Sequence, residues 1–322
     1  MKTFIFIPDT DMNAGLGHYH RCIKYSNFIR RNNIIFLIYK NFKYKDLINK
    51  NFYGININYI FFHDLVKTLS FLNFDRKNVV TILDTYKKKK RLINFGKISS
   101  THVNILDYRV KCKGDYIIDH TFNRSRNYHI NNSILKVGVD YFPIIETSFS
   151  KKKDIILINF GSVKSKKLIK KSLIFLKKIN LSKSYKIVIV DQNFLKKDLP
   201  KSKMENEIFI FKYVKNINKI YSKTFFSFGA CGISLYEKCY FHIPCISKSV
   251  ARNQITNFKN FYSKACILNF DKVTNLKMSV KKYNYNIFLQ QVLEVKEKLK
   301  KKFIYEKNKS KLNKIFKNLN EI

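Results

Sequence analysis

The sequence predicts an α/β protein with two domains, each a parallel sheet wrapped by helices, facing each other across a cleft. Short apolar runs suited to buried strands alternate along the chain with segments long enough for a helix. Two such series follow one another, and a glycine turn opens a helix in each. The 322 residues and the hydrophobic content of 45% suffice for two domains of ordinary size.

The predicted strands fall into two groups. The first series places them at residues 4–7, 33–39, 58–62, 79–83, 103–106 and 115–118, and the second at 155–158, 186–190, 208–211, 225–228, 244–246 and 266–268. A lysine run at 151–153 marks the boundary, so we expect domains 1–150 and 151–322. From about Ile287 onward, apolar residues at helical spacing predict a C-terminal packing helix. Ligands of such sheets bind beyond the carboxyl ends of the strands, so the cleft is the expected site.

The charge is strongly positive, at +41. Such a charge attracts nucleotide phosphates, nucleic acid or anionic membranes. Lysines are spread over nearly the whole chain, and Lys, Asn, Ile, Phe and Tyr are overused together, which indicates a composition bias. We therefore expect no nucleic-acid partner and at most a weak peripheral attraction to membranes. The sequence gives no sign of an oligomeric state.

The cysteines and histidines show no metal-binding pattern. No Cys-x-x-Cys pair occurs among the cysteines, which stand at Cys22, Cys112, Cys231, Cys239, Cys245 and Cys266. We expect buried free thiols, no structural metal and no cofactor. No apolar run approaches the roughly 20 residues that cross a bilayer, and the first residues do not resemble a secretory signal. We expect a cytoplasmic protein.

The first glycine turn, Gly15-Leu16-Gly17, follows the opening strand and leads into a helix that begins near His18. A dinucleotide fingerprint needs a third glycine where His20 stands, and a phosphate loop needs a Gly-Lys-Ser/Thr that is absent. What remains is a short turn with His18 at its rim and Arg21 one helical turn on. His18 is either a catalytic residue facing a bound ligand or a cap or core residue.

The second glycine turn reads strand, turn and helix again, over residues 228–237. The N–H groups at the start of this helix are suited to a diphosphate, and Glu237 to both hydroxyls of a ribose. The alternative is a tight turn with Glu237 as a solvated acid in the first turn of the helix. Matching turns in both halves favour the nucleotide interpretation.

These segments resemble a known family. Residues 15–18 with Arg21-Cys22, then residues 232–237, Ile243-Pro244 and Asn253-Gln254, are similar to the UDP-sugar hydrolases of the pseudaminic acid pathway. Residues 84–86 look like the family's Asp-His-Tyr, and residues 138–149 like its Gly-x-x-Tyr segment ending in Phe. The resemblance runs to about residue 270 and implies the GT-B fold.

The resemblance implies a function and roles for residues. The family releases UDP from UDP-2,4-diacetamido-2,4,6-trideoxy-β-L-altropyranose, and by position His18 is the general base that activates water. Gly17, Arg21, Tyr86 and Asn253 are carried over as substrate-binding residues. The carried-over UDP-binding residues are Gly161, Cys231, Gly232, Ile233, Ser234 and Glu237. Inversion at the anomeric carbon follows from a single displacement, and backbone N–H groups stabilise the leaving group without a metal.

The sequence departs from the family at three places. The family's paired Asp is Asp107-Tyr108 here, its Gly-Gly-x-Asp is reduced to residues 160–163, and its Leu-Arg is Ile145-Glu146. These changes leave the nucleotide side largely intact and leave the sugar undetermined. Two alternatives to a hydrolase of nonulosonic acid biosynthesis therefore stay open: a GT-B glycosyltransferase using a nucleotide-sugar donor, and a non-catalytic nucleotide-sugar binder.

Overall fold

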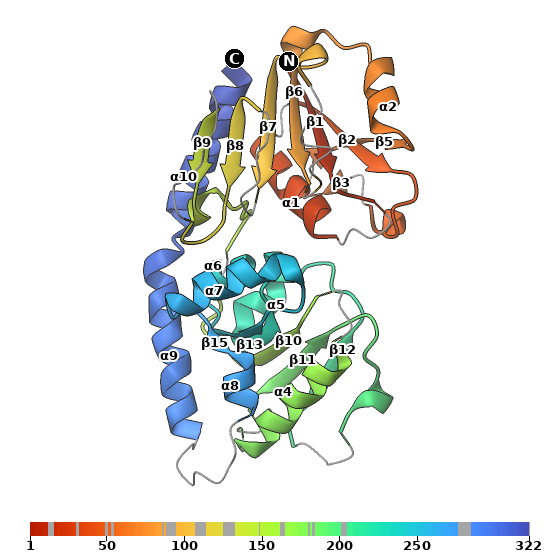
Figure 1. Ribbon diagram of the computed structural model, residues 1–322. Helices are drawn as coiled ribbons and strands as arrows, with labels where there is room; N and C mark the ends of the chain where they lie inside the picture. The colour runs from red at the N-terminus through yellow and green to blue at the C-terminus, as the bar shows by residue number, and fades with distance from the viewer. Residues whose placement is uncertain are drawn as a thin grey trace. The chain divides into compact units, whose positions relative to one another are not determined.

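The chain folds into two units, which are described one at a time (Figure 1). Unit 1 comprises Met1–Ile145 and Glu306–Ile322, and unit 2 comprises Glu146–Tyr305. The computed structural model describes residues 1–11, 16–29, 32–48, 51–52, 55–85, 87, 95–106, 114–124, 133–147, 149–161, 165–179, 181, 184–200, 205–275 and 285–321.

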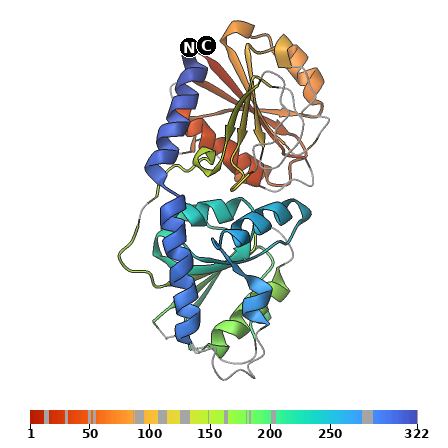
Figure 2. The same cartoon turned by 60° about the vertical axis from the view of Figure 1, so that its left-hand side comes forward.

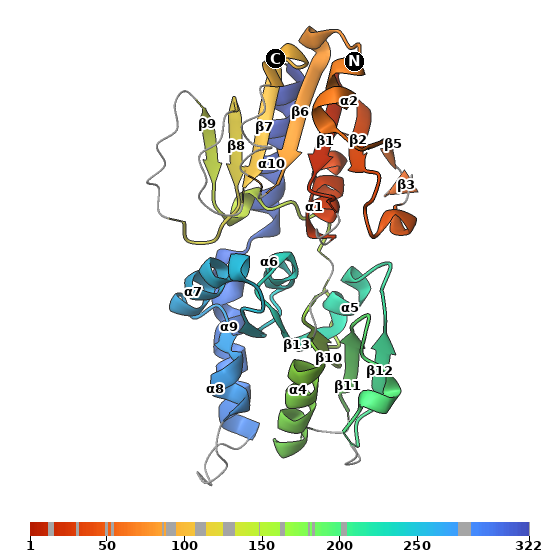
Figure 3. The same ribbon diagram turned by 45° about the vertical axis from the view of Figure 1, so that its right-hand side comes forward.

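Unit 1 is built on a seven-stranded parallel sheet in the order β5-β2-β1-β6-β7-β8-β9, which Figure 3 shows from right to left. The strands are β1 Thr3–Pro8, β2 Asn33–Tyr39, β5 Asn58–Phe62, β6 Val79–Asp84, β7 Thr101–Leu106, β8 Tyr116–Asp119 and β9 Ile134–Val137. The central strands β1 and β6 are buried on both faces, which explains their almost continuous apolar sequence. Their register pairs Pro8 with Asp84, so both strands end at the same edge.

Helices cover both faces of this sheet. The helix α1, Gly17–Ser26, packs Tyr19 and Cys22 on the face that carries Phe4 and Phe6. The helix α2, Leu65–Phe71, packs on the opposite face, and the Asp64 side chain caps it by accepting the Val66 and Lys67 N–H groups. A small antiparallel pair is formed by β3 Asn51–Phe52 and β4 Ile55–Asn56.

The last helix is α10, Tyr305–Glu321, and from Glu306 onward it belongs to unit 1 (Figure 2). Its apolar stripe joins the same core as α1, with Leu312, Ile315, Phe316 and Leu319 buried. The Asn308 amide donates to the Asp140 carbonyl at 2.8 Å, and the Lys311 ammonium pairs with the Asp140 carboxylate at 2.6 Å. The domain prediction, which placed 151–322 together, therefore differs from the observed division, because this stripe packs on the first sheet.

Unit 2 is built on a six-stranded parallel sheet in the order β12-β11-β10-β13-β14-β15. The strands are β10 Ile155–Asn159, β11 Lys186–Val190, β12 Ile208–Phe211, β13 Thr224–Ala230, β14 Cys245–Lys248 and β15 Leu268–Asn269. The helices are α4 Lys166–Lys178, α5 Asn218–Lys223, α6 Ile233–Tyr240, α7 Ile255–Ser263, α8 Phe270–Thr274 and α9 Tyr285–Lys302. Helices α4, α8 and α9 pack on the face that carries Ile156 and Phe228. Tyr221 of α5 packs on the face that carries Leu157.

Short 3₁₀ turns complete the secondary structure of both units. They are η1 Asn27–Ile29, η2 Lys45–Leu47, η3 Arg76–Asn78, η4 Phe95–Lys97, η5 Val139–Tyr141, η6 Lys196–Asp198 and η7 Arg252–Gln254. Among the helices that the structure describes, none is long and apolar enough to cross a membrane.

The predicted fold class is confirmed, and every strand predicted from an apolar run has a counterpart in one of the two sheets. The strand β9 was not predicted, because it is short and lies half-buried at the sheet edge. The predicted C-terminal helix is in fact two helices. They are separated at Phe303, whose ring is fully buried against Tyr240 and Phe261.

Candidate functional site

The first candidate site lies where α1 begins in unit 1. The helix starts at Gly17 with Leu16 before it, and no side chain caps its N-terminus. His18 and Arg21 are three residues apart, so they lie on the same face of the helix. Both are buried, with His18 7% and Arg21 1% exposed. The remainder of the glycine turn, residues 12–15, lies outside the described residues.

Asp84, the last residue of β6, holds both side chains. His18 Nδ1 lies 2.7 Å from Asp84 Oδ1. The Arg21 guanidinium makes two hydrogen bonds to the same carboxylate, from Nε to Oδ2 at 2.7 Å and from Nη2 to Oδ1 at 2.5 Å. The Asp84 backbone is fixed as well, since its carbonyl accepts the Asp9 N–H at 2.7 Å. A fully buried carboxylate is thus paired on both oxygens.

The charge on Asp84 determines the tautomer that we assign to His18. Burial raises the pKa of Asp84, but the charge of Arg21 and the interactions with His18 outweigh it and hold the pKa well below its usual range. An ionised carboxylate only accepts hydrogen bonds, so we assign a proton to His18 Nδ1, which donates it to Asp84. Arg21 Nη2 lies 3.2 Å from the same nitrogen, and in this tautomer it donates to Asp84 instead. In the neutral ring Nε2 then has the lone pair. Nε2 is therefore the ring atom of His18 that can accept a proton.

His120 completes this cluster from the end of β8. It is fully buried, Arg21 Nη1 lies 3.3 Å from its Nε2, and its ring packs edge-on against Phe142. Burial, and then the charge of Arg21, lower the pKa of His120 well below its usual value, so the ring is neutral and accepts from Arg21. His120 was not predicted. The polar run directly after the apolar strand β8 is the signal that identifies it.

Two further predictions concern this part of the chain. Tyr86, predicted to bind substrate, lies outside the described residues, as do Asp107 and Tyr108. The neighbouring Thr85 is buried, and its hydroxyl donates to Asp9 Oδ2 at 3.0 Å. Asp84 itself was part of the resembling segment, but its role as the partner of His18 was not predicted.

The second candidate site lies in unit 2, where β13 leads through Cys231 and Gly232 into α6. Gly232 precedes the helix with an extended backbone, so Ile233 and Ser234 form the first turn. The N–H groups of a first helical turn have no acceptor inside the helix, and they favour an anion. The fully buried Cys231 has a pKa raised to about 12, mainly by burial, so it is a packing residue.

Residues before and within α7 support this turn. The Asn257 amide donates to the Cys231 carbonyl at 3.2 Å, and Tyr236 of α6 donates to Asn257 Oδ1 at 2.9 Å. The Gln254 oxygen accepts the Val250 N–H at 3.1 Å, and a Cβ placed on Gly232 would lie 3.4 Å from Gln254 Nε2. Gln254 therefore lies beside the turn, whereas the neighbouring Asn253, which was predicted to bind substrate, is exposed.

Glu237 and Gly161 lie in this unit as well. Glu237 is half-buried in the second turn of α6, and Tyr221 donates to its Oε2 at 3.1 Å. It is therefore held by α5 rather than being the solvated first-turn acid of the alternative interpretation. Gly161 follows β10 and Phe160 with a φ of +80°, a conformation that glycine adopts without strain.

The predicted site residues thus form two groups. Gly17, His18 and Arg21 belong to unit 1. The members of the unit 2 group are Gly161, Cys231, Gly232, Ile233, Ser234, Glu237 and Asn253. Within the described ranges there is no cluster of His, Cys, Asp or Glu suited to a metal ion, and the cysteines found there are buried and unpaired. Cys112 lies outside them.

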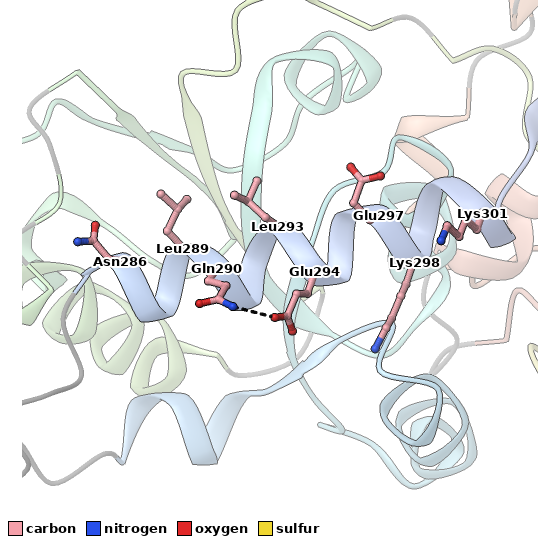
Figure 4. Close-up of a pocket in the computed structure, with 8 residues that line it drawn as sticks. All are labelled: Asn286, Leu289, Gln290, Leu293, Glu294, Glu297, Lys298 and Lys301. Atoms are coloured by element: carbon pink, nitrogen blue, oxygen red, sulfur yellow. Dashed lines mark hydrogen bonds between the residues drawn. The ribbon is translucent and has the colours of Figure 1, made fainter.

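A pocket also runs along one side of α9 (Figure 4). Its lining residues are Asn286, Leu289, Gln290, Leu293, Glu294, Glu297, Lys298 and Lys301, all from that helix. The pocket contains none of the predicted site residues. Gln290 donates to Glu294 at 3.3 Å, a contact between successive turns on the helix surface. We therefore place the functional site at the two strand ends instead.

No protein-family model matches the sequence, and no curated protein sequence matches it. Solved structures do match the fold over nearly the whole chain. UGT2 of Phytolacca americana, complexed with UDP-2fluoro-glucose and pterostilbene, superposes with a TM-score of 0.62 at 10% identity over 94% of each chain. UGT71G1 of Medicago truncatula, complexed with UDP-glucose, has a TM-score of 0.61 at 12% identity over 99% of this chain and 98% of its own.

A third match is UGT89C1 of Arabidopsis thaliana complexed with UDP-L-rhamnose, with a TM-score of 0.61 at 11% identity over 97% and 98% of the two chains. At this level of identity the likeness concerns the fold. The chain therefore has the GT-B fold of these glycosyltransferases. Its buried histidine–aspartate pair lies at the carboxyl end of the central strand β6, and its glycine turn lies at the carboxyl end of the central strand β13.

Proposed function

We propose that this protein is a glycosyltransferase that takes its sugar from a UDP-sugar donor, with His18 as the general base. The observation that carries the proposal is the His18–Asp84 pair, which leaves Nε2 as the basic atom of a buried imidazole. The fold adds support, because structures with this fold have been solved in complex with UDP-sugars. The positive charge of the chain favours an anionic donor.

In this mechanism an acceptor hydroxyl gives its proton to His18 Nε2 while its oxygen attacks the anomeric carbon of the sugar. The new carbon–oxygen bond forms as the bond to the UDP oxygen breaks, and UDP leaves with the electron pair. Because the displacement is single, the anomeric configuration inverts. Asp84 holds the ring by its Nδ1–H and stabilises the imidazolium that forms.

Unit 2 would bind the donor. The N–H groups of Ile233 and Ser234 would hold the diphosphate, and Gly161 would give the backbone after β10 room to approach it. Glu237, held by Tyr221, would accept hydrogen bonds from the ribose hydroxyls. Gly17, Arg21, Tyr86 and Asn253 stay proposed as residues near the sugar, with Arg21 acting through His18 and Asp84 because it is fully buried.

The second candidate is the hydrolase implied by the resemblance of residues 15–18 and 232–237. Water would replace the acceptor hydroxyl, and the same His18 Nε2 would take its proton. The substrate would be a UDP-linked 2,4-diacetamido-2,4,6-trideoxy-hexose. The third candidate, a non-catalytic binder, is disfavoured by the paired and oriented His18, which a binder does not need.

The test is release of UDP by the purified protein from a panel of UDP- and CMP-linked sugars, with and without acceptors. Pterostilbene and quercetin are suitable first acceptor probes, since structures of this fold contain them. A transferase releases UDP quickly only with an acceptor and forms a glycoside. Equal release without any acceptor would favour the hydrolase, and binding of UDP without turnover of any donor would favour the binder.

A further inference from the structure

Lys238 of α6 is a buried lysine with no evident structural partner. Its side chain is only 1% exposed, whereas lysines such as Lys171 are exposed. Among the described residues its ammonium makes neither an ion pair nor a hydrogen bond. Burying a charge without an ion pair is costly, and burial lowers the pKa of Lys238 more than the neighbouring Cys245 and Glu237 raise it. A methionine would fill the same space without this cost, so the charge needs an explanation.

The ammonium lies at the carboxyl ends of the central strands of unit 2. A Cβ placed on Gly229 would lie 2.6 Å from Lys238 Nζ and 2.6 Å from the Asn159 carbonyl oxygen. Glycine at 229 therefore makes room for the lysine. In the sheet register Gly229 stands beside Asn159 of β10 and Ser247 of β14, so three small or polar residues lie side by side near the carboxyl ends of these strands. Two residues earlier on β10, the same face carries the apolar Leu157.

Both turns that we assign to the donor leave the sheet from this same edge. After β10 ends at Asn159, the chain continues through Phe160 to Gly161. After β13 ends at Ala230, it continues through Cys231 to Gly232. A buried cation beneath these turns adds to the field of the α6 N-terminus, where low polarity and little screening strengthen its effect.

We propose that Lys238 is a positioning residue of the donor site, whose ammonium supplies positive charge for a diphosphate bound at the carboxyl ends of β10 and β13. The inference rests on the proposed function, because there the anion is the diphosphate of UDP. The bound diphosphate would then supply the ion pair that Lys238 lacks among the described residues. Lys238 acts through the backbone turns and does not itself take part in proton transfer.

The experiment compares the wild type with Lys238→Met and with Lys171→Met, which removes the same charge from the exposed surface of α4. Titration calorimetry with UDP and with inorganic pyrophosphate measures the dissociation constants. We expect Lys238→Met to weaken both ligands about tenfold or more, as for loss of a buried charge a few ångströms away, and Lys171→Met to change them less than twofold. A thermal unfolding measurement of Lys238→Met, with its Tm, tests whether the variant is folded.

The pH dependence of ligand affinity distinguishes a lysine that attracts the ligand by its charge from a lysine with a purely structural role. Between pH 7 and pH 9 the wild type should lose part of its advantage over Lys238→Met, because the lowered pKa of Lys238 brings its deprotonation closer to this range. Equal affinities of folded wild type and Lys238→Met would overturn the inference and leave the nucleotide function standing. Lys238-dependent binding of pyrophosphate with no tighter binding of UDP would instead contradict the nucleotide function alone. Binding of neither ligand to the wild type would refute both.

Discussion

The two units carry buried charge in opposite ways. In unit 1 the Asp84 carboxylate is paired on both oxygens by Arg21 and His18, so the site is complete before any ligand arrives. In unit 2 the buried Lys238 makes no ion pair among the described residues, although the charge of Glu237 acts on it, and the first turn of α6 presents N–H groups. The first arrangement holds the His18 ring in position, and the second leaves N–H groups and a positive charge that favour an anion. This difference supports the proposed roles, with proton transfer in unit 1 and donor binding in unit 2.

The largest effect is expected when the Asp84 carboxylate, which pairs with Arg21 and His18 in unit 1, is neutralised. Asp84→Asn leaves the Arg21 guanidinium buried without its counter-charge, which costs about 3–5 kcal/mol of folding free energy. It also permits the wrong tautomer of His18, so turnover should fall even in molecules that fold. Urea unfolding measures the first effect, and UDP release measures the second. An Asp84→Asn protein with wild-type stability would show that the pair is not needed to hold unit 1 together.

The second test separates the base from the fold of unit 1. His18→Ala removes the imidazole but leaves Arg21 and Asp84 paired, so turnover should fall by about 10²- to 10⁴-fold with only a small change in Tm. The matched control is His63→Ala, at an exposed position before α2. We expect UDP to bind both variants equally well, because we propose that the donor binds to unit 2. Near-normal turnover by His18→Ala would rule out His18 as the base.

The third test uses acid. The pKa of Asp84 is lowered in the folded protein, so its stabilisation is fully present above its unfolded pKa of about 4 and is lost as pH falls toward the folded pKa. Unfolding measured from pH 6 down to pH 2 should show the free energy of unfolding decreasing below about pH 4. The decrease should be smaller in Asp84→Asn, which has no carboxylate to protonate at this position. Parallel curves for the two proteins would contradict the assignment.

The fold was easier to predict from the sequence than the contacts within the candidate site. An apolar run directly indicates a buried parallel strand, so β1 and β13 were predicted nearly at their observed positions. The same reasoning selected His18 as a candidate, because it follows a glycine turn at the start of a helix, and its catalytic role stays a prediction. It missed Asp84 as the partner of His18, and His120, because these contacts join residues 66 and 99 positions apart in the chain (His18 to Asp84 and Arg21 to His120). Sequence spacing does not give such distances.

The same limit applies in unit 2. Lysines are so common in this chain that Lys238 looks like any other, and only its position behind Gly229 identifies it. The packing of α10 on the first sheet was also hidden, since an apolar stripe shows that a helix packs but not against which sheet.

The smallest expected effect concerns the buried charge of unit 2 and is a change in the stability of the protein without ligand. Lys238→Met removes a buried charge with no partner, so without ligand the variant should be more stable than the wild type, by about 1 kcal/mol. The lowered pKa gives the sign of the pH dependence. Below the folded pKa the lysine is charged in both states and its burial is fully unfavourable. As pH rises toward the unfolded value of about 10, the folded state loses its proton first and the penalty shrinks. The stability gap between variant and wild type should therefore narrow from pH 7 to pH 9.5, as measured by urea unfolding, while Lys171→Met shows no such trend. A variant less stable than the wild type at pH 7 would mean that Lys238 is a structural residue, and the contrast between the two units would then disappear.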